Sequence, residues 1–138
     1  MVSENQTTIY ISSKIESIDD AVIEAVKFAG AMSFAEDAIF GIDMAVREAV
    51  ANAVKHGNKL DESKDVEIIL KDDSGTLDIS IRDFGEGFDV SMVPDPTNPE
   101  NLLKASGRGI LFMQNFVDTV EWARHPEGGM VVKMRKNR

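Results

Sequence analysis

The sequence predicts an α+β fold, a two-layer sandwich in which helices cover one face of a mixed or antiparallel sheet. Two observations lead to this prediction. Apolar residues recur at helical spacing through most of residues 21–57, whereas they alternate with polar residues over 66–82 and again near the C-terminus. A polar turn divides the first alternating stretch and indicates antiparallel strands. Helices and hairpins in separate blocks are typical of a sheet with its helices on one side.

The first two elements are expected to be a strand and a helix. Residues 7–12 alternate in polarity, which predicts the strand. Ser17, followed by Asp20 three residues later, has the spacing of a helix cap. The helix that we expect after this cap spans residues 21–32.

A long central helix is expected over residues 34–57. Ser33 and Glu36 have the spacing of a capping box, in which each side chain satisfies a backbone N–H of the first turn. Gly57 and Asn58 suit the left-handed conformation that ends many helices. The apolar stripe that this helix would bury consists of Ile39, Ile42, Val46, Ala49, Val50 and Ala53.

The second half of the chain alternates strands with turns. A hairpin is expected from two alternating runs, 66–70 and 77–82, joined by the turn residues Asp72–Gly75. Three prolines exclude a long helix from residues 84–104, and a loop of this length is usually functional or disordered. The remaining predicted elements are a helix over 109–117 and two strands, around 120–122 and 130–134, joined by a turn at 125–129.

Composition restricts the class of protein. The 138 residues are expected to form one domain, 1–138, with a substantial core. The net charge of −9 argues against a nucleic-acid or anionic-membrane partner, because both require a positive surface. The absence of cysteine excludes disulfides and thiolate chemistry. Because we find neither a signal peptide nor a membrane-spanning apolar run, we expect a soluble, cytoplasmic protein.

Three polar residues share one face of the central helix. Glu48, Asn52 and Lys55 are spaced i, i+4 and i+7, which places them in one stripe that differs from the apolar one. Taken alone, such a stripe is either a solvated surface or the wall of a site.

A second candidate feature is the carboxyl of Asp83. Asp83 continues the phase of the preceding apolar residues, so its side chain is expected on the core side at the end of a strand. A buried carboxylate is costly unless a donor satisfies it. It either caps a turn or accepts a hydrogen bond from the exocyclic amine of adenine, where guanine would offer an acceptor instead. Gly85 and Gly87 would let the backbone approach a ligand closely.

A third feature is the segment Gly107, Arg108 and Gly109, which leads directly into an apolar helix. This arrangement either aims free N–H groups at an anion such as a phosphate or is a simple helix-entry turn. The Walker A, Rossmann and eukaryotic kinase motifs are absent from the sequence.

In their order and separation, these features resemble the N, G1 and G2 boxes of the GHKL ATPases, the superfamily of gyrase, heat-shock chaperones, histidine kinases and MutL-type proteins. Within it, residues 48–57 and 107–113 are most similar to the bacterial anti-sigma-factor serine/threonine kinases. The resemblance covers nearly the whole chain and implies the histidine-kinase-like ATPase fold. The motifs that carry it are Glu48-x-x-x-Asn52, Asp83-x-Gly85-x-Gly87 and Gly107-x-Gly109.

The resemblance implies a site for ATP and Mg²⁺. Asn52 would bind Mg²⁺ through its side-chain carbonyl, which suits a cation that takes hard oxygen ligands. Asp83 would accept the adenine amine, and residues 88–106 would form the ATP lid. The other residues that the resemblance assigns to nucleotide binding are Lys55, Gly85, Gly87, Gly107, Arg108 and Gly109.

Glu48 distinguishes among the relatives that the resemblance brings together. Histidine kinases usually carry asparagine there and use a separate phosphoacceptor domain, which we expect this chain to lack. A carboxylate at position 48 can accept the proton of an attacking hydroxyl. The resemblance therefore implies a serine/threonine kinase with Glu48 as its general base. In the family pattern, such a kinase binds a sigma factor, phosphorylates a STAS-type anti-anti-sigma protein and forms a homodimer.

Two departures from the family pattern favour an alternative. Lys104 and Ala105 stand where many relatives have an arginine, so that either Lys104 or Arg108 would meet the γ-phosphate. Met130 follows Gly129 where the family often has threonine, which removes a hydroxyl contact. The alternative is a catalytically weak ATP-binding switch module that sequesters a signalling partner without phosphorylating it.

Overall fold

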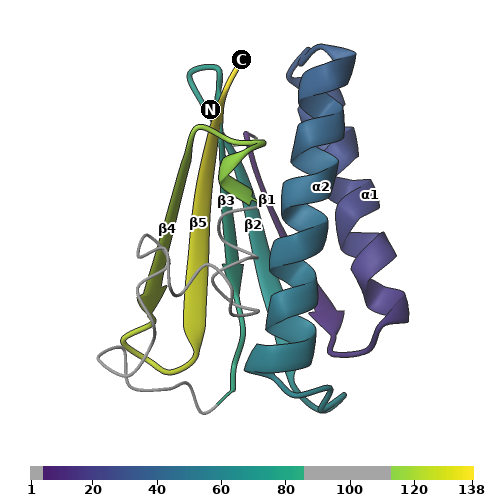
Figure 1. Ribbon diagram of the computed structural model, residues 1–138, viewed down its shortest axis with the longest axis vertical. Coiled ribbons are helices and arrows are strands. Elements are labelled where there is room, and N and C mark those ends of the chain that lie inside the picture. The colour runs from purple at the N-terminus through teal and green to yellow at the C-terminus, as the bar shows by residue number, and fades with distance from the viewer. Residues whose placement is uncertain (1–4, 86–112) are drawn as a thin grey trace.

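A computed structural model of the chain describes residues 5–85 and 113–138. Two helices form one layer and a five-stranded sheet forms the other (Figure 1). In chain order the elements are β1 (Gln6–Ser12), α1 (Glu16–Ala31), α2 (Glu36–Asn52), the π-helical turn η1 (Ala53–Gly57), β2 (Asp65–Asp73), β3 (Thr76–Arg82), β4 (Thr119–Arg124) and β5 (Met130–Asn137). The predicted two-layer α+β sandwich is confirmed.

The sheet is antiparallel throughout its described strands, in the order β1-β2-β3-β5-β4. Alternate residues of β2 and β3 point into the core against α1 and α2, as their sequence period requires. The strand residues that are at most 1% exposed are Val66, Ile68, Leu70, Leu77, Ile79, Ile81 and Met134. The helices contribute small and branched side chains to the same core, including Ala21, Ala25, Ile42, Val46 and Val50.

The predicted hairpin is confirmed, with Ser74 and Gly75 as its two-residue loop between Asp73 and Thr76. Both loop residues have positive φ, 52° and 95°. Two positive φ values are typical of the type I′ turn, whose twist matches that of the flanking strands.

The predicted cap of the first helix is wrong. α1 begins at Glu16, so Ser17 lies inside the first turn, where its side chain is buried. Ile15 occupies the N-cap position and gives no side-chain hydrogen bond. The acidic residues Glu16 and Asp19 lie in the first turn, where the helix dipole favours negative charge.

The predicted capping box at Ser33 is also wrong, because Ser33 ends α1 instead of beginning α2. Its φ is 68°, and its N–H donates to the carbonyl of Gly30 at 3.0 Å. The N–H of Phe34 donates to the carbonyl of Ala29 at 3.3 Å, which completes a Schellman motif. Ala35 is the N-cap residue of α2 and makes no side-chain cap.

The central helix reaches residue 57 as predicted, but its end differs from the expected one. The last turn is π-helical, with the N–H of Asn58 donating to the carbonyl of Ala53 at 2.8 Å. The left-handed residues are Lys59 and Leu60, with φ of 55° and 61°, and not Gly57. The expected glycine stop is therefore wrong, and Gly57 has another role.

Several predictions lie outside the described residues. These are most of the loop over 84–104, the lid over 88–106, the first four residues of the helix over 109–117, and the residues Gly87, Lys104, Gly107, Arg108 and Gly109. Of the described residues in that predicted helix, only Met113 and Gln114 are helical, so the helix ends earlier than predicted. Met113 and Val117 are buried against the core. Among the described residues, no helix is long and apolar enough to cross a membrane.

Candidate functional site

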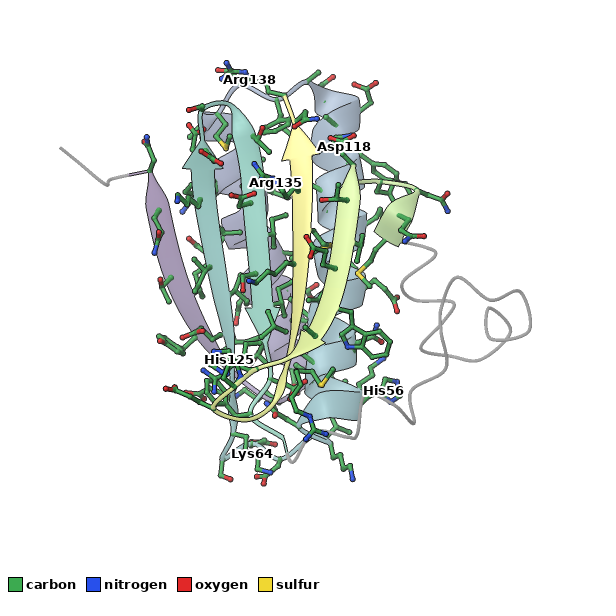
Figure 2. All side chains as sticks on the ribbon, turned by 90° about the vertical axis from the view of Figure 1, so that its left-hand side faces the viewer. His56, Lys64, Asp118, His125, Arg135 and Arg138 are labelled. Atoms are coloured by element: carbon green, nitrogen blue, oxygen red, sulfur yellow. The ribbon has the colours of Figure 1, made fainter. Side chains whose placement is uncertain are left out.

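The predicted site residues that the structure describes gather at one end of the molecule. The end of α2, the end of β3 and the turn between β4 and β5 meet there (Figure 1). Figure 2 shows His56 from the helix end and His125 from the turn at this end, with Arg138 and Asp118 at the opposite one. Antiparallel pairing of β3 with β5 brings Asp83 beside Met130, 47 residues later in the chain.

The carboxyl of Asp83 is the central polar group of this end, and its side chain is buried as predicted. Asp83 is only 5% exposed. Its Oδ1 accepts hydrogen bonds from the N–H of Gly85 at 3.1 Å and from the N–H of Met130 at 3.2 Å. The described residues donate no hydrogen bond to Oδ2. One oxygen is therefore held by backbone N–H groups, and the other packs close to Gly57 at the end of the central helix.

Burial raises the pKa of the Asp83 carboxyl above its ordinary value, because the charged form loses its hydration. The N–H groups of Gly85 and Met130 oppose this shift, followed by the positive charges of Arg82 and Lys64. The net direction is upward, so the backbone donors leave part of the desolvation cost uncompensated. A ligand that donates a hydrogen bond to this carboxyl would offset part of that cost.

Three glycines are packed too closely around Asp83 to carry a side chain. A Cβ on Gly57 would overlap the Asp83 carboxyl, and a Cβ on Gly85 would overlap the carbonyl oxygen of Gly57. A Cβ on Gly129 would overlap the backbone carbonyl of Asp83, and Gly129 also has a φ of +82°. The π-helical turn η1, the turn after β3 and the turn before β5 are therefore packed closely together.

A cavity of about 100 Å³ opens beside the Asp83 carboxyl. Its wall is mostly apolar, and its polar lining side chains are Asn52, His56 and Asp83. An apolar slot with one buried acceptor suits a flat heteroaromatic ring that carries an amino group. The apolar lining residues are Ala49, Ala53, Ile81, Met113, Trp122, Met130 and Val132.

Of the predicted polar stripe on the central helix, only Asn52 lines the cavity. Glu48 is half-buried one turn before it, and Lys55 is exposed. The change from α- to π-helical winding after Asn52 adds a residue to the last turn, so Lys55 does not continue the α-helical phase. Glu48 and Asn52 still share the phase that their i, i+4 spacing predicts.

The described residues contain no group of three His, Cys, Asp or Glu side chains that could hold a metal by themselves. Asn52 offers one neutral oxygen at the cavity. This suits Mg²⁺, which is usually bound by few protein ligands and completes its shell with phosphate oxygens and water. An Mg²⁺–nucleotide therefore fits this donor better than a free cation would.

The residues of this end that the sequence analysis did not assign to the site include His56, Asn58, Trp122 and Met130. His56, Trp122 and Met130 line the cavity, and Asn58 is buried beneath the turn that follows Asp83. Trp122 and Met130 lie on strands far along the chain, so only their strand phase could have indicated that they point inward. Asn58 carried a misleading signal, because an asparagine after a glycine at a helix end is typical of a local stop.

Comparison with known proteins identifies a family and relatives that match nearly the whole chain. The chain matches the family described as "Histidine kinase-like ATPase domain" over residues 11–136. The anti-sigma F factor of Heyndrickxia coagulans is 28% identical over 97% of this chain and 93% of its own length. The anti-sigma F factor of Oceanobacillus iheyensis is 32% identical over 96% of this chain and 92% of its own length.

Solved structures share the fold. The structure of the RsbU and RsbW domains of a Mycobacterium tuberculosis protein has a TM-score of 0.69 at 16% identity, covering 96% of this chain and 32% of that one. The catalytic domain of the histidine kinase ThkA has a TM-score of 0.59 at 13% identity, covering 95% of this chain and 97% of that one.

Proposed function

Because the chain belongs to the histidine kinase-like ATPase family, we propose that it is an ATP- and Mg²⁺-dependent serine/threonine protein kinase. The single observation that carries this proposal is the buried Asp83 carboxyl, which lines an apolar cavity and has one oxygen held by backbone N–H groups. Such an acceptor favours adenine, whose exocyclic amine donates, over guanine, whose carbonyl accepts.

Two helix residues account for the rest of the proposed reaction. Asn52 would hold Mg²⁺ through its side-chain oxygen, and the cation would offset the charge of the ATP phosphates. Glu48, one turn earlier, would take the proton of a serine or threonine hydroxyl while that oxygen attacks the γ-phosphorus and ADP leaves. Lys55, Arg108 and the glycines Gly87, Gly107 and Gly109 are proposed to surround the phosphates.

The proposed biological role is that of an anti-sigma factor in a partner-switching system. The support comes from relatives named anti-sigma F factor that match nearly the full length of this chain. In this role the protein would bind a sigma factor and phosphorylate a STAS-type anti-anti-sigma protein. It would act in the cytoplasm as a homodimer. Each subunit would consist of one domain, residues 1–138.

Transfer of radiolabelled γ-phosphate from ATP to proteins in a lysate of the source organism tests the kinase proposal. Glu48→Gln should lower transfer by about 10²-fold or more, because a general base is lost. Its ADP affinity should stay near that of the wild type. Glu36→Gln, an exposed glutamate at the start of the same helix, is the matched control and should transfer normally. Equal transfer by all three proteins would refute the role of Glu48.

A binding module remains the second candidate, and Met130 is the observation that favours it. Its side chain lines the cavity and offers no hydroxyl, whereas its N–H is already used by Asp83. Trp122 is the one tryptophan of the chain and lines the same cavity, so its fluorescence should report nucleotide binding. Normal ADP binding by this signal, with no labelled protein in the lysate, would favour the switch module over the kinase.

A further inference from the structure

The side chain of Asn58 is buried in a place where a surface residue would be expected. Asn58 follows the last turn of the central helix and is 2% exposed. Its Nδ2 donates to the Oγ of Ser13 at 2.7 Å and to the carbonyl of Asp65 at 2.9 Å. Its Oδ1 accepts the N–H of Phe84 at 2.8 Å. The amide is thus satisfied from three separate segments, and the only described donor to Oδ1 comes from the turn after Asp83.

Phe84 lies between the two residues that define the base acceptor. Asp83 supplies the carboxyl, and the N–H of Gly85 binds its Oδ1. The ring of Phe84 also packs against Arg82, whose guanidinium carbon lies 4.2 Å from the ring centre. Arg82 in turn donates to the carbonyl of Gly128 at 3.1 and 3.3 Å. The backbone N–H of Phe84 is therefore the point where the turn is attached to the helix layer.

The two groups that accept hydrogen bonds from the Asn58 Nδ2, Ser13 Oγ and the Asp65 carbonyl, are themselves fixed in the structure. Ser13 is fully buried, and its Oγ donates to the carbonyl of Lys64 at 2.6 Å. Asp65, whose carbonyl accepts the other Nδ2 hydrogen, is the first residue of β2 and pairs with Ser12 of β1. The amide is therefore anchored to the first two strands, which are part of the rigid sheet, so it can hold the Phe84 N–H at a fixed distance from the core.

We propose that Asn58 is a positioning residue for base recognition. By holding the Phe84 N–H, its Oδ1 fixes the turn that keeps the Asp83 carboxyl at the wall of the cavity. The inference rests on the proposed nucleotide binding and adds a residue that acts through Asp83 without touching the base. An asparagine is needed because one planar group must supply two donors and an acceptor in fixed directions.

Three variants separate positioning from general stability. Asn58→Ala removes the acceptor for the Phe84 N–H. Asn58→Asp keeps an acceptor but loses both donors, and Ser13→Ala removes one partner of Nδ2 while leaving the contact to Phe84. All three should lower the melting temperature, since each disturbs a buried hydrogen-bond network. Only Asn58→Ala should loosen the Asp83 turn.

The measurement is the affinity for ADP and for GDP by titration calorimetry, at a temperature where the variants are folded. The wild type should prefer ADP. Asn58→Ala should reduce that preference by roughly tenfold, the effect of one well-placed hydrogen bond. Asn58→Asp and Ser13→Ala should keep the preference within about twofold of the wild type, despite their lower melting temperatures.

The outcomes are distinct. The positioning role would be overturned if the preference for ADP over GDP fell in proportion to the melting temperature across the three variants. It would also be overturned if Asn58→Ala kept that preference. Either result would leave the proposed function intact. If Asn58→Ala does not fold, Asn58→Asp decides: a retained preference supports the role of the acceptor, and a lost one contradicts it. A wild type that binds neither ADP nor GDP would refute both the nucleotide site and the role of Asn58.

Discussion

The two helices lie side by side in the same layer and have nearly equal lengths, 16 and 17 residues, but they end in different ways. α1 ends in a Schellman motif, with Ser33 in the left-handed conformation and its orphan carbonyls satisfied by the next two N–H groups. α2 passes into a π-helical turn whose last residue, Gly57, packs against Asp83. The first end follows local rules, and the second follows contacts with distant strands.

The glycines at the two ends show what this difference means. Gly30 lies in the last turn of α1, and a Cβ there would meet nothing within 4 Å apart from its own helix and chain neighbours. Gly57 lies in the last turn of the central helix, and a Cβ there would overlap a buried carboxyl. A helix that only supports the core can end by local chemistry, whereas one that forms a site must leave room for it.

The largest expected effect is that of Gly57→Ala. The new methyl group would displace the Asp83 carboxyl, and overpacking of this kind costs about 3 kcal/mol of unfolding free energy. ADP binding should be lost with it, because the base acceptor moves. Urea denaturation and titration calorimetry measure the two effects. A variant as stable as the wild type, with unchanged ADP affinity, would show that the two helix ends are equivalent.

Asp83→Asn should change ligand preference more than it changes the fold. Asparagine keeps an Oδ1 that can accept from Gly85 and Met130, but it places an NH₂ group where Oδ2 was. That group faces the adenine amine donor to donor, so ADP affinity should fall by about tenfold or more, while GDP should bind no worse. Affinities for both nucleotides would be measured together. An undiminished preference for ADP would exclude Asp83 as the base acceptor.

The stability of the wild type should depend on pH through Asp83. Its pKa is raised in the folded state, so the folded protein binds the proton more tightly than the unfolded one does. The contribution of Asp83 is therefore full below its unfolded pKa and is lost as pH rises through the folded pKa. Relative to the wild type, Asp83→Asn should gain stability over that interval, as measured by urea denaturation at a series of pH values.

Asp61→Asn is the matched control with the opposite sign. Asp61 is exposed, and the hydroxyl and N–H of Ser63 donate to its Oδ1 at 2.6 and 3.0 Å, which lowers its pKa. Its contribution is present above its unfolded pKa and is lost as pH falls through the folded one. Asp61→Asn should therefore lose stability relative to the wild type as pH rises. If the unfolding free energies of the two variants, each relative to the wild type, changed with pH in the same direction, the opposite pKa shifts of Asp83 and Asp61 would be contradicted.

The smallest expected effect is that of Gly30→Ala, and it has the opposite sign to Gly57→Ala. Alanine loses less conformational freedom than glycine when a helix forms, and the site has space for the methyl group. The expected gain is about 0.5–1 kcal/mol of unfolding free energy, with no change in ADP binding. A loss of stability in this variant would mean that the end of α1 is also constrained by tertiary packing.

Periodicity and turn chemistry, both local properties of the sequence, determined most of the architecture. The strand phases of β2 and β3, the loop at Ser74–Gly75 and the burial of Asp83 followed from alternation alone. The order of the family boxes in the sequence indicated the fold and the candidate acceptor. Strand phase, turn type and the burial of a strand residue depend on residues close in sequence, so the spacing of residues predicts them.

The tertiary structure alone decided how the central helix ends and how the site is held together. The spacing of Ser33 and Glu36 is that of a capping box, yet Ser33 ends α1 in the left-handed conformation, so spacing alone assigned it to the wrong helix. Gly57 and Asn58 form a plausible local stop, yet contacts with Asp83 and Phe84, 26 residues away along the chain, determine their conformation. Local patterns cannot specify such choices, because the deciding energies come from groups that meet only when the sheet and helices pack.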